Sequence, residues 1–408
     1  MNILYIDHYA GSKSMGMEFR PYYLGMIWTE MGHNVTIVGS SFSHLRMCQP
    51  IINGPVTAEN LDGLDYLWIK GIKYAGNGFG RLLNVLQFLF GLFFYQKKIL
   101  EKSQPDVVIA SSTYPMDIWP AKYLAKSSNA RLVFELHDVW PQSLTEIAGL
   151  SKYHPLVIFA GMAERTVYSA ADRVVSILPA VHEHCSSLGF DTTNLTIVPN
   201  GIVIDDWSLN DASLPEKIST AVSDMRLKGH MIVCYTGAHG APNELENLIN
   251  AAELLRNEAI SFLMVGGGHL KLELEELVAT KKLDNISMCE SIPKLAIPKL
   301  LALVDVGFIG AKKRPIYKHG ISPNKIADYM MAEIPVICAI EAGNDLVKEA
   351  NCGYSIAPSN AEALASTILH MDSIGHSKRK IMGQRGKQYV LRHYNYVTLA
   401  KKFMEAFK

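Results

Sequence analysis

The sequence predicts an α/β protein built from two doubly wound domains, each with a parallel sheet, that face each other. Short aliphatic and β-branched runs alternate with longer helix-like stretches along the 408 residues. Most of these runs are continuously apolar, as expected for parallel strands covered on both faces. The length fits two large domains. The segment from Asn200 to His230, rich in Gly, Asp, Asn and Ser, interrupts the alternation and marks the boundary.

The expected strands divide between the two halves of the chain. In the first half they are Ile3–Asp7, Val35–Val38, Tyr66–Ile69, Val107–Ser111, Leu132–Leu136, Arg173–Ile177 and Leu195–Val198. In the second half they are Ile232–Thr236, Phe262–Val265, Ile286–Met288, Val306–Ile309, Val336–Ile340 and Tyr354–Ile356. We expect Rossmann-like domains at 1–205 and 206–392, with an amphipathic helix at about 393–408 returning to the first domain. The carboxyl ends of both sets of strands would then surround one cleft, where such sheets bind ligands.

Composition excludes several classes of protein. Lysine plus arginine (39) equals aspartate plus glutamate (39), so no global charge favours nucleic acid. The six cysteines form no C-x-x-C pair, which indicates a reduced, cytoplasmic protein without structural zinc. The first residues enter a strand-like run directly and have no basic n-region, so we expect no signal peptide.

One apolar segment, Leu82 to Gln96, suggests a membrane surface. It holds no charge, contains Phe88, Phe90, Phe93, Phe94 and Tyr95, and lies between Arg81 and Lys97–Lys98. It is too short to span a bilayer but long enough to lie in its interface. We therefore expect peripheral association with the cytoplasmic face of the inner membrane. The alternative is a core helix beneath the first sheet.

The stretch from Gly320 to Val336 predicts an anion site. Ser322 suits a helix N-cap and Pro323 the first helical position, so the free N–H groups of Asn324 and Lys325 would point into positive potential. Asp328, one turn later, would repel a phosphate but could accept hydrogen bonds from a ribose. A nucleoside diphosphate satisfies both groups. The alternative is an ordinary capped helix that leads into a buried strand.

Three glycine-containing turns follow predicted strands. The first holds Gly11 and Gly16, with Arg20 shortly after; the second holds Gly237 and His239; the third holds Gly266 and Gly267. The first does not have the G-x-G-x-x-G dinucleotide spacing. Glycine would let a base or phosphate approach the backbone at each turn, although glycine is also the usual residue of any tight bend.

His137 and Asp138 stand at the end of another predicted strand, followed by Val-Trp-Pro141. Chemistry in α/β proteins gathers at such strand ends. His137 could donate or accept a proton, and Asp138 could orient the His137 side chain. The alternative is a histidine hydrogen-bonded in a turn.

Taken in order, these segments resemble GT-B glycosyltransferases of family 4. The similarity runs from the first glycine loop through Glu135–Pro141, Val198–Gly201 and Val265–Gly268 to Ser322–Val336. The residues in these motifs are similar to those of the bacterial O-antigen and capsule subgroup that includes L-fucosamine transferases. The resemblance implies metal-independent transfer, with retention, of an N-acetylated amino sugar from UDP to a saccharide on a polyprenyl diphosphate carrier, with no further cofactor.

The resemblance also assigns roles to residues. The base would lie near Gly266, Gly267 and Ile292, the ribose on Asp328, and the diphosphate on Ser322–Lys325 and the Gly11–Gly16 loop. His137 and Lys325 would serve the reacting groups, together with Asp138. A retaining reaction of this type lets the departing phosphate oxygen take the acceptor's proton, so His137 is expected to position and stabilise.

Two departures from the family pattern stand out. The family's first motif acid corresponds to Gly320 here, and the positions of its usual Arg and Lys correspond to Ala238 and Asn243. We expect Lys325 and the helix start, with Arg20 or Lys312–Arg314, to balance the diphosphate charge. Two other functions fit the same fold: a UDP-sugar 2-epimerase, which needs no acceptor, and a non-catalytic nucleotide-sugar binder.

Overall fold

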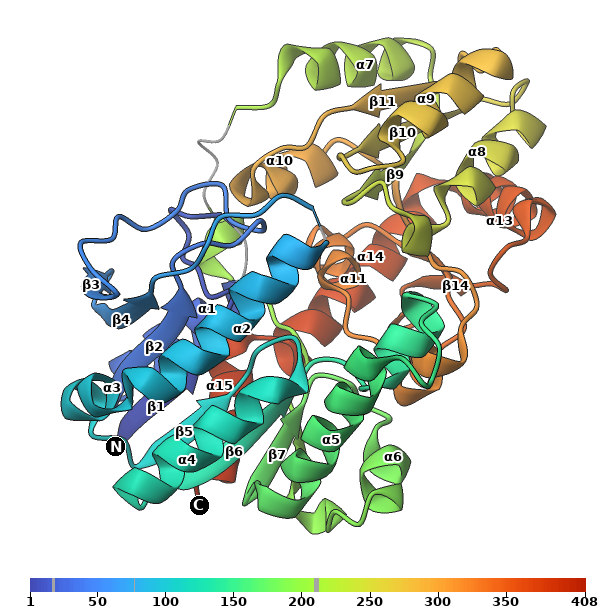
Figure 1. Cartoon of the computed structure of the whole chain (residues 1–408). Helices are drawn as coiled ribbons and strands as arrows, with labels where there is room; N and C mark the ends of the chain where they lie inside the picture. Colours follow the sequence, from blue (N-terminus) through green and yellow to red (C-terminus); the bar gives the residue numbers. More distant parts are fainter. Residues whose placement is uncertain (17–18, 77, 209–212) are drawn as a thin grey trace. The chain divides into compact units, whose positions relative to one another are not determined.

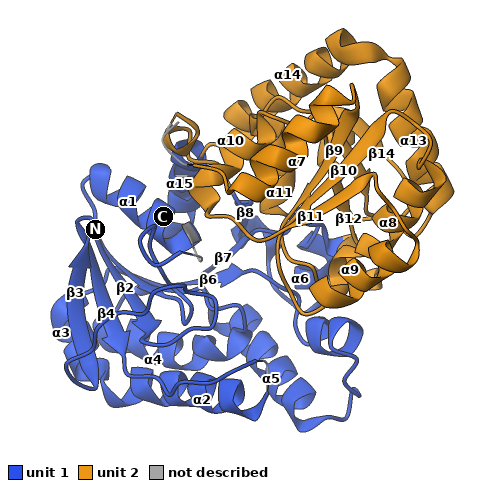
Figure 2. Ribbon diagram, turned by 90° about the horizontal axis from the view of Figure 1, so that it is seen from above, with its two compact units in different colours: residues 1–200, 319–322, 396–408 blue, residues 201–318, 323–395 orange. Residues whose placement is uncertain are grey.

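The computed structural model describes residues 1–16, 19–76, 78–208 and 213–408. Met17 and Glu18, in the stretch between Gly16 and Arg20, therefore lie outside the described residues. The chain forms two compact units, coloured separately in Figure 2. Unit 1 comprises residues 1–200, 319–322 and 396–408, and unit 2 comprises 201–318 and 323–395. The first crossing falls between Asn200 and Gly201, where a boundary at 205 was expected.

Unit 1 contains an eight-stranded sheet in the order β3-β4-β2-β1-β5-β6-β7-β8. The strands are β1 (Asn2–Ile6), β2 (Asn34–Ser40), β3 (Val56–Leu61), β4 (Leu64–Ile69), β5 (Val107–Ala110), β6 (Arg131–Leu136), β7 (Arg173–Ser176) and β8 (Leu195–Ile197). All neighbours are parallel except β3 and β4, which form an antiparallel hairpin at one edge. The sequence interpretation missed β3, because only its first residue, Val56, is buried and the others alternate between partly and fully exposed, as an edge strand allows.

Helices cover both faces of this sheet. They are α1 (Phe19–Glu30), α2 (Phe79–Phe94), α3 (Gln96–Ser103), α4 (Ile118–Ser128), α5 (Pro155–Ala170), α6 (His182–Ser187) and α15 (Tyr396–Phe403). Helices α2, α4 and α5 lie side by side over one face (Figure 1). On the other, α15 packs on α1: the Trp28 ring lies 5.1 Å from that of Phe403 and 5.3 Å from that of Phe407. The indole N–H of Trp28 donates to the carbonyl of Ala400 at 3.1 Å.

Unit 2 contains a parallel six-stranded sheet in the order β11-β10-β9-β12-β13-β14. Its strands are β9 (Met231–Thr236), β10 (Ile260–Val265), β11 (Ile286–Cys289), β12 (Val306–Gly310), β13 (Val336–Ala339) and β14 (Gly353–Ser355). Its helices are α7 (Glu216–Leu227), α8 (Leu245–Leu254), α9 (Lys271–Thr280), α10 (Ile297–Leu301), α11 (Asn324–Met331), α12 (Leu346–Glu349), α13 (Ala361–Ser373) and α14 (Gly375–His393). Apolar clusters fill both sides of the sheet.

The predicted fold class, two α/β units with parallel sheets, is confirmed. The continuously apolar runs are the central strands, buried along their whole length. Among the described residues, no helix combines the length and the hydrophobicity that crossing a membrane requires.

Candidate active site

In unit 2, the glycine turns after β9 and β10 are bound to each other through their backbones. The N–H of Gly237 donates to the carbonyl of Val265 at 2.9 Å, and the N–H of His239 donates to that of Gly267 at 2.7 Å. A Cβ at Gly266 would lie 1.8 Å from the Gly237 carbonyl oxygen. Glycine is therefore required at Gly266 by the packing of one loop on the other. The Cβ of a residue at position 267 would meet only the Ser291 hydroxyl, at 3.0 Å.

Lys325 extends from the first turn of α11 over the turn after β9. Its ammonium donates to the Tyr235 hydroxyl at 2.9 Å and to Asn243 Oδ1 at 3.1 Å, and it lies 4.6 Å from the centre of the Tyr235 ring. A Cβ at Gly237 would lie 2.4 Å from Lys325 Cε, so glycine there leaves room for the lysine. No carboxylate pairs with Lys325 among the described residues. Burial lowers its pKa to about 8.

Asp328, on the same helix, is held by a cation that the sequence reasoning did not include. Lys294 Nζ lies 2.5 and 2.6 Å from the two carboxylate oxygens. The side chain of Asp328 is 8% exposed and that of Lys294 is 35% exposed. Ile292, two residues before Lys294, packs against the core of unit 2. A ribose bound at Asp328 would have to share these oxygens with Lys294 or displace it.

The start of α11 differs from the expected capping. The helix begins at Asn324, Pro323 is its N-cap residue, and no side chain caps it. The Ser322 hydroxyl instead accepts the backbone N–H of Asn200 at 2.8 Å, and the Asn200 amide donates to the Ser322 carbonyl at 2.9 Å. Ser322 thus belongs to unit 1, where its hydroxyl is used to hold the chain after β8.

His239 is buried, and neither of its ring nitrogens has a hydrogen-bond partner among the described residues. Burial, with the charge of Lys271 acting in the same direction, lowers its pKa. The ring is therefore neutral near pH 7 and retains a donor and an acceptor that the protein does not satisfy.

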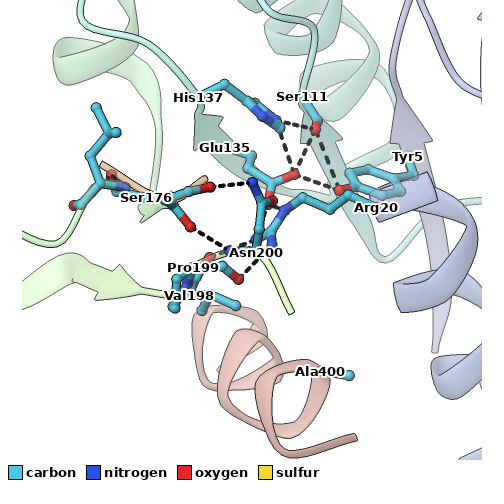
Figure 3. A network of polar contacts seen from close by, with 12 residues as sticks. Tyr5, Arg20, Ser111, Glu135, His137, Ser176, Val198, Pro199, Asn200 and Ala400 are labelled. Atoms are coloured by element: carbon cyan, nitrogen blue, oxygen red, sulfur yellow. Dashed lines mark hydrogen bonds and ion pairs between the residues drawn. The ribbon is translucent and has the colours of Figure 1, made fainter. Parts of the chain in front are cut away.

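In unit 1, a buried network surrounds the carboxylate of Glu135, the fifth residue of β6 (Figure 3). Glu135 is fully buried. Its Oε1 accepts from Arg20 Nε at 2.8 Å, and its Oε2 accepts from the hydroxyls of Tyr5 at 2.5 Å and Ser111 at 2.6 Å. Burial alone would raise the pKa of Glu135, but the charge of Arg20 and the surrounding hydrogen bonds hold it well below its usual value.

Arg20, from the first turn of α1, is occupied inside this network. Besides Glu135, it donates to the carbonyl of Pro199 at 2.8 Å and to that of Val198 at 2.7 Å. Its side chain is 6% exposed. The structure thus uses Arg20 to tie β6 to the chain after β8, and gives no support to the expectation that it balances a bound diphosphate.

His137 follows β6 and joins the same network. Its Nε2 lies 3.0 Å from the Ser111 hydroxyl and 3.5 Å from Glu135 Oε2. Asp138, expected to orient it, is exposed and forms no hydrogen bond with it in the described part of the chain. The carboxylate that contacts His137 is Glu135. The sequence signal that could have identified Glu135 is an acidic residue inside an otherwise apolar strand, because a buried carboxylate needs hydrogen-bond or charged partners.

The first glycine loop follows β1 in unit 1. The carbonyl of Gly11 accepts from the Tyr66 hydroxyl at 2.8 Å, and Gly16 has a positive φ of 67°. Its N–H donates to the carbonyl of Ser12 at 3.1 Å. The loop is a tight turn, and its role toward a donor remains a prediction.

The comparisons with known proteins cover both units. A family model described as Glycosyltransferase Family 4 matches residues 16–206, and one described as Glycosyl transferases group 1 matches residues 230–372. The "Probable glycosyltransferase WbjE" of Pseudomonas aeruginosa is 22% identical over 364 residues, covering 86% of this chain and 88% of its own. The "Putative colanic acid biosynthesis glycosyl transferase WcaI" of Escherichia coli K12 is 26% identical over 258 residues, covering 60% and 61%.

Solved structures share the fold over the whole chain. Sucrose-phosphate synthase of Thermosynechococcus elongatus has a TM-score of 0.75 at 16% identity and covers 100% of this chain and 98% of its own. The Anabaena protein HepE, solved in complex with UDP-glucose, has a TM-score of 0.67 at 14% identity and covers 99% and 98%.

Proposed function

From the premise that this chain is a glycosyltransferase of the GT-B fold, we propose that it transfers an N-acetylated amino sugar from UDP to a lipid-linked saccharide in bacterial polysaccharide biosynthesis. The transfer retains the anomeric configuration and uses no metal ion. The UDP-glucose complex of HepE supports the donor class, and the similarity to WcaI, named as a colanic acid biosynthesis glycosyl transferase, supports the process.

The observation that carries the donor assignment is Lys325. Its ammonium is partly buried, and its partners are a phenol and an amide, which do not neutralise it. A partly buried cation with neutral partners gains from an anionic ligand. A diphosphate on Lys325 and the free N–H groups at the start of α11 would supply that charge without a metal ion.

A donor screen tests the proposal. Purified protein is incubated with a panel of UDP-sugars, with and without a saccharide on polyprenyl diphosphate, and UDP release and product mass are followed. We expect UDP release that depends on the acceptor, with a product of retained configuration. An epimerised donor formed without acceptor would identify a UDP-sugar 2-epimerase instead. UDP-sugar binding without any turnover would contradict the proposal.

We propose that α2 brings unit 1 to an anionic membrane surface. One side of this helix is buried through Val85, Phe88, Leu89 and Leu92. The other side leaves Phe90 68% exposed and Phe94 85% exposed. The sequence left two possibilities open, a core helix and an interfacial helix; the buried side of α2 packs in unit 1, and the exposed phenylalanines are the support for the proposed interfacial role.

The exposed apolar surface extends to the neighbouring helices of unit 1. Phe93 lies 6.0 Å, ring to ring, from the half-exposed Tyr123 of α4. On α5, Ile158 and Met162 are more than half exposed. The exposed charges on α4 are lysines, Lys122 and Lys126. Apolar side chains within a basic surround match an anionic bilayer, since each cation near such a surface adds roughly 1 kcal/mol.

Phe90→Asp combined with Phe94→Asp tests the docking. Both side chains are exposed, so the protein is expected to fold and yet lose co-sedimentation with vesicles of phosphatidylglycerol and phosphatidylethanolamine. Leu227→Asp with Leu272→Asp, at exposed apolar positions of unit 2, is the matched control and should bind vesicles as the wild type does. Vesicle binding by the Phe90/Phe94 variant equal to that of the control would refute the docking surface.

A further inference from the structure

We propose that Glu135, together with Ser111, is the positioning group of His137: the pair fixes the imidazole with a proton on Nε2 and leaves Nδ1 as the nitrogen that meets the substrate. The contacts within unit 1 carry the first half of this inference (Figure 3). The role of Nδ1 toward a sugar or an acceptor hydroxyl rests on the proposed function.

The direction of each hydrogen bond follows from counting protons. Glu135 is ionised, since Arg20 pairs with it and its pKa is held low, so both of its oxygens only accept. Ser111 has one hydroxyl proton, and its 2.6 Å contact with Glu135 Oε2 uses that proton. The Ser111 oxygen can then only accept in its 3.0 Å contact with His137. Nε2 of His137 must therefore carry a hydrogen.

The other residues of the network fix the position of the Glu135 carboxylate. Tyr5 and Arg20 hold the carboxylate from β1 and α1, and Arg20 is itself fixed by the carbonyls of Val198 and Pro199. The Glu135 carboxylate is thus held in place by groups from several elements, independently of its contact with His137. Nδ1 of His137 has no hydrogen-bond partner among the described residues.

The charges around His137 act in both directions. Burial disfavours the imidazolium and Arg20 adds to that effect, but the hydrogen bond and charge of Glu135, with a smaller contribution from Asp7, raise the pKa of His137 above its usual value. Asp117 also faces this region, and burial raises its own pKa to about 7. Tyr5 stays neutral, because burial raises its pKa. Asp138 is the remaining carboxylate nearby in sequence.

A protonated imidazole held in this way has a defined chemical use. With Nε2–H committed to Ser111, an imidazolium presents Nδ1–H as a hydrogen-bond donor of fixed direction. Such a donor can hold a sugar hydroxyl, or stabilise negative charge on the departing phosphate, without taking the acceptor's proton. A neutral ring would present Nδ1 as an acceptor. Glu135 therefore selects between the two roles by favouring the charged form.

NMR of histidine-labelled protein tests the positioning without any donor. Long-range ¹H–¹⁵N spectra assign the His137 tautomer and its titration, and the His137→Ala spectrum identifies its signals. We expect a proton on Nε2, and a His137 pKa that is lower in Glu135→Gln than in the wild type, because this substitution keeps the shape of the side chain but removes its charge. A neutral ring protonated on Nδ1, or an unshifted titration in folded Glu135→Gln, would overturn the proposal.

Ser111→Ala is a second variant that keeps the Arg20–Glu135 ion pair. It allows the test to be made even if the Glu135→Gln protein does not fold. It should mix the two His137 tautomers; a ring that stays wholly on one tautomer would overturn the role of Ser111. Glu164→Gln is the matched control, because it opens another buried Glu–His pair of unit 1, with His184 at 2.8 Å. It should leave the tautomer and the titration of His137 unchanged.

Once a donor is known, kinetics separate positioning from structure. Glu135→Gln should lower kcat with little change in the Kd of UDP, and should move the alkaline decline of kcat to lower pH as the His137 pKa falls. A decline at unchanged pH would show that Glu135 supports only the fold. Failure to find any donor would leave the NMR result intact, so the two proposals fail separately.

Discussion

The affinity for UDP should depend on pH through Lys325. In the free protein, burial lowers the pKa of this lysine to about 8 from its usual 10.5. That difference corresponds to roughly 3 kcal/mol favouring the uncharged amine. A bound diphosphate favours the ammonium and raises the pKa again. UDP should therefore bind the protonated form, and binding above pH 8 should require proton uptake.

The size of the effect follows from the fraction of protonated lysine. With a pKa of about 8, roughly nine-tenths of Lys325 is charged at pH 7 and roughly one-tenth at pH 9, so the Kd of UDP should rise about ten-fold between them. The phosphates of UDP are already ionised across this range, since the second phosphate pKa is about 6. Burial raises the pKa of the neighbouring Tyr235 and lowers that of His239, so neither titrates there.

Isothermal titration calorimetry at several pH values, in buffers of different ionisation enthalpy, measures both the Kd and the proton uptake. Lys325→Met should bind UDP more weakly at pH 7, with no dependence on pH from 7 to 9. Lys387→Met, which alters a lysine of unit 2 paired with Glu333 at 2.7 Å, should keep the wild-type dependence. A wild-type Kd that is constant from pH 7 to 9, or a slope that survives in Lys325→Met, would refute the reasoning.

Three further outcomes are expected. Asp328→Ala should weaken UDP binding about ten-fold or more, because losing a hydrogen bond to a charged group costs roughly 1.5–3 kcal/mol; unchanged affinity by calorimetry would remove the ribose assignment. Turnover should persist in excess EDTA, and activity that disappears with EDTA and returns with magnesium or manganese would contradict a metal-independent reaction. His137→Ala should bind UDP nearly normally but transfer sugar at least about a hundred-fold more slowly, because His137 belongs to unit 1 whereas Lys325 and Asp328 belong to unit 2; a wild-type transfer rate would reduce it to a turn residue.

The fold could be predicted because its signals are local. A central parallel strand must be apolar along its length, and runs such as Met231–Thr236 and Ile260–Val265 show that property directly. The edge strand Val56–Leu61 was missed for the same reason: with Glu59 and Asn60 in it, it lacks the expected run.

The side-chain partners could not be predicted, because they join residues far apart in the sequence. Glu135 meets Arg20 across 115 positions, and Lys294 meets Asp328 across 34. Each charge was visible alone, but its neutralising partner depends on strand order and helix placement. Ser322 is an example: its residue type suits an N-cap, yet in the fold its hydroxyl accepts a hydrogen bond from the backbone N–H of Asn200.

The division of the chain has a consequence for its synthesis. The polypeptide passes between the units at 200/201, 318/319, 322/323 and 395/396. Trp28, near the start, packs against Phe403 and Phe407 near the end. Unit 1 therefore lacks the helix that covers Trp28 until the last residues of the chain have been made. The amino-terminal half of the chain emerges from the ribosome first but cannot finish folding before the carboxyl terminus is free, and a nascent chain stalled before Tyr396 would expose that uncovered aromatic surface to chaperones.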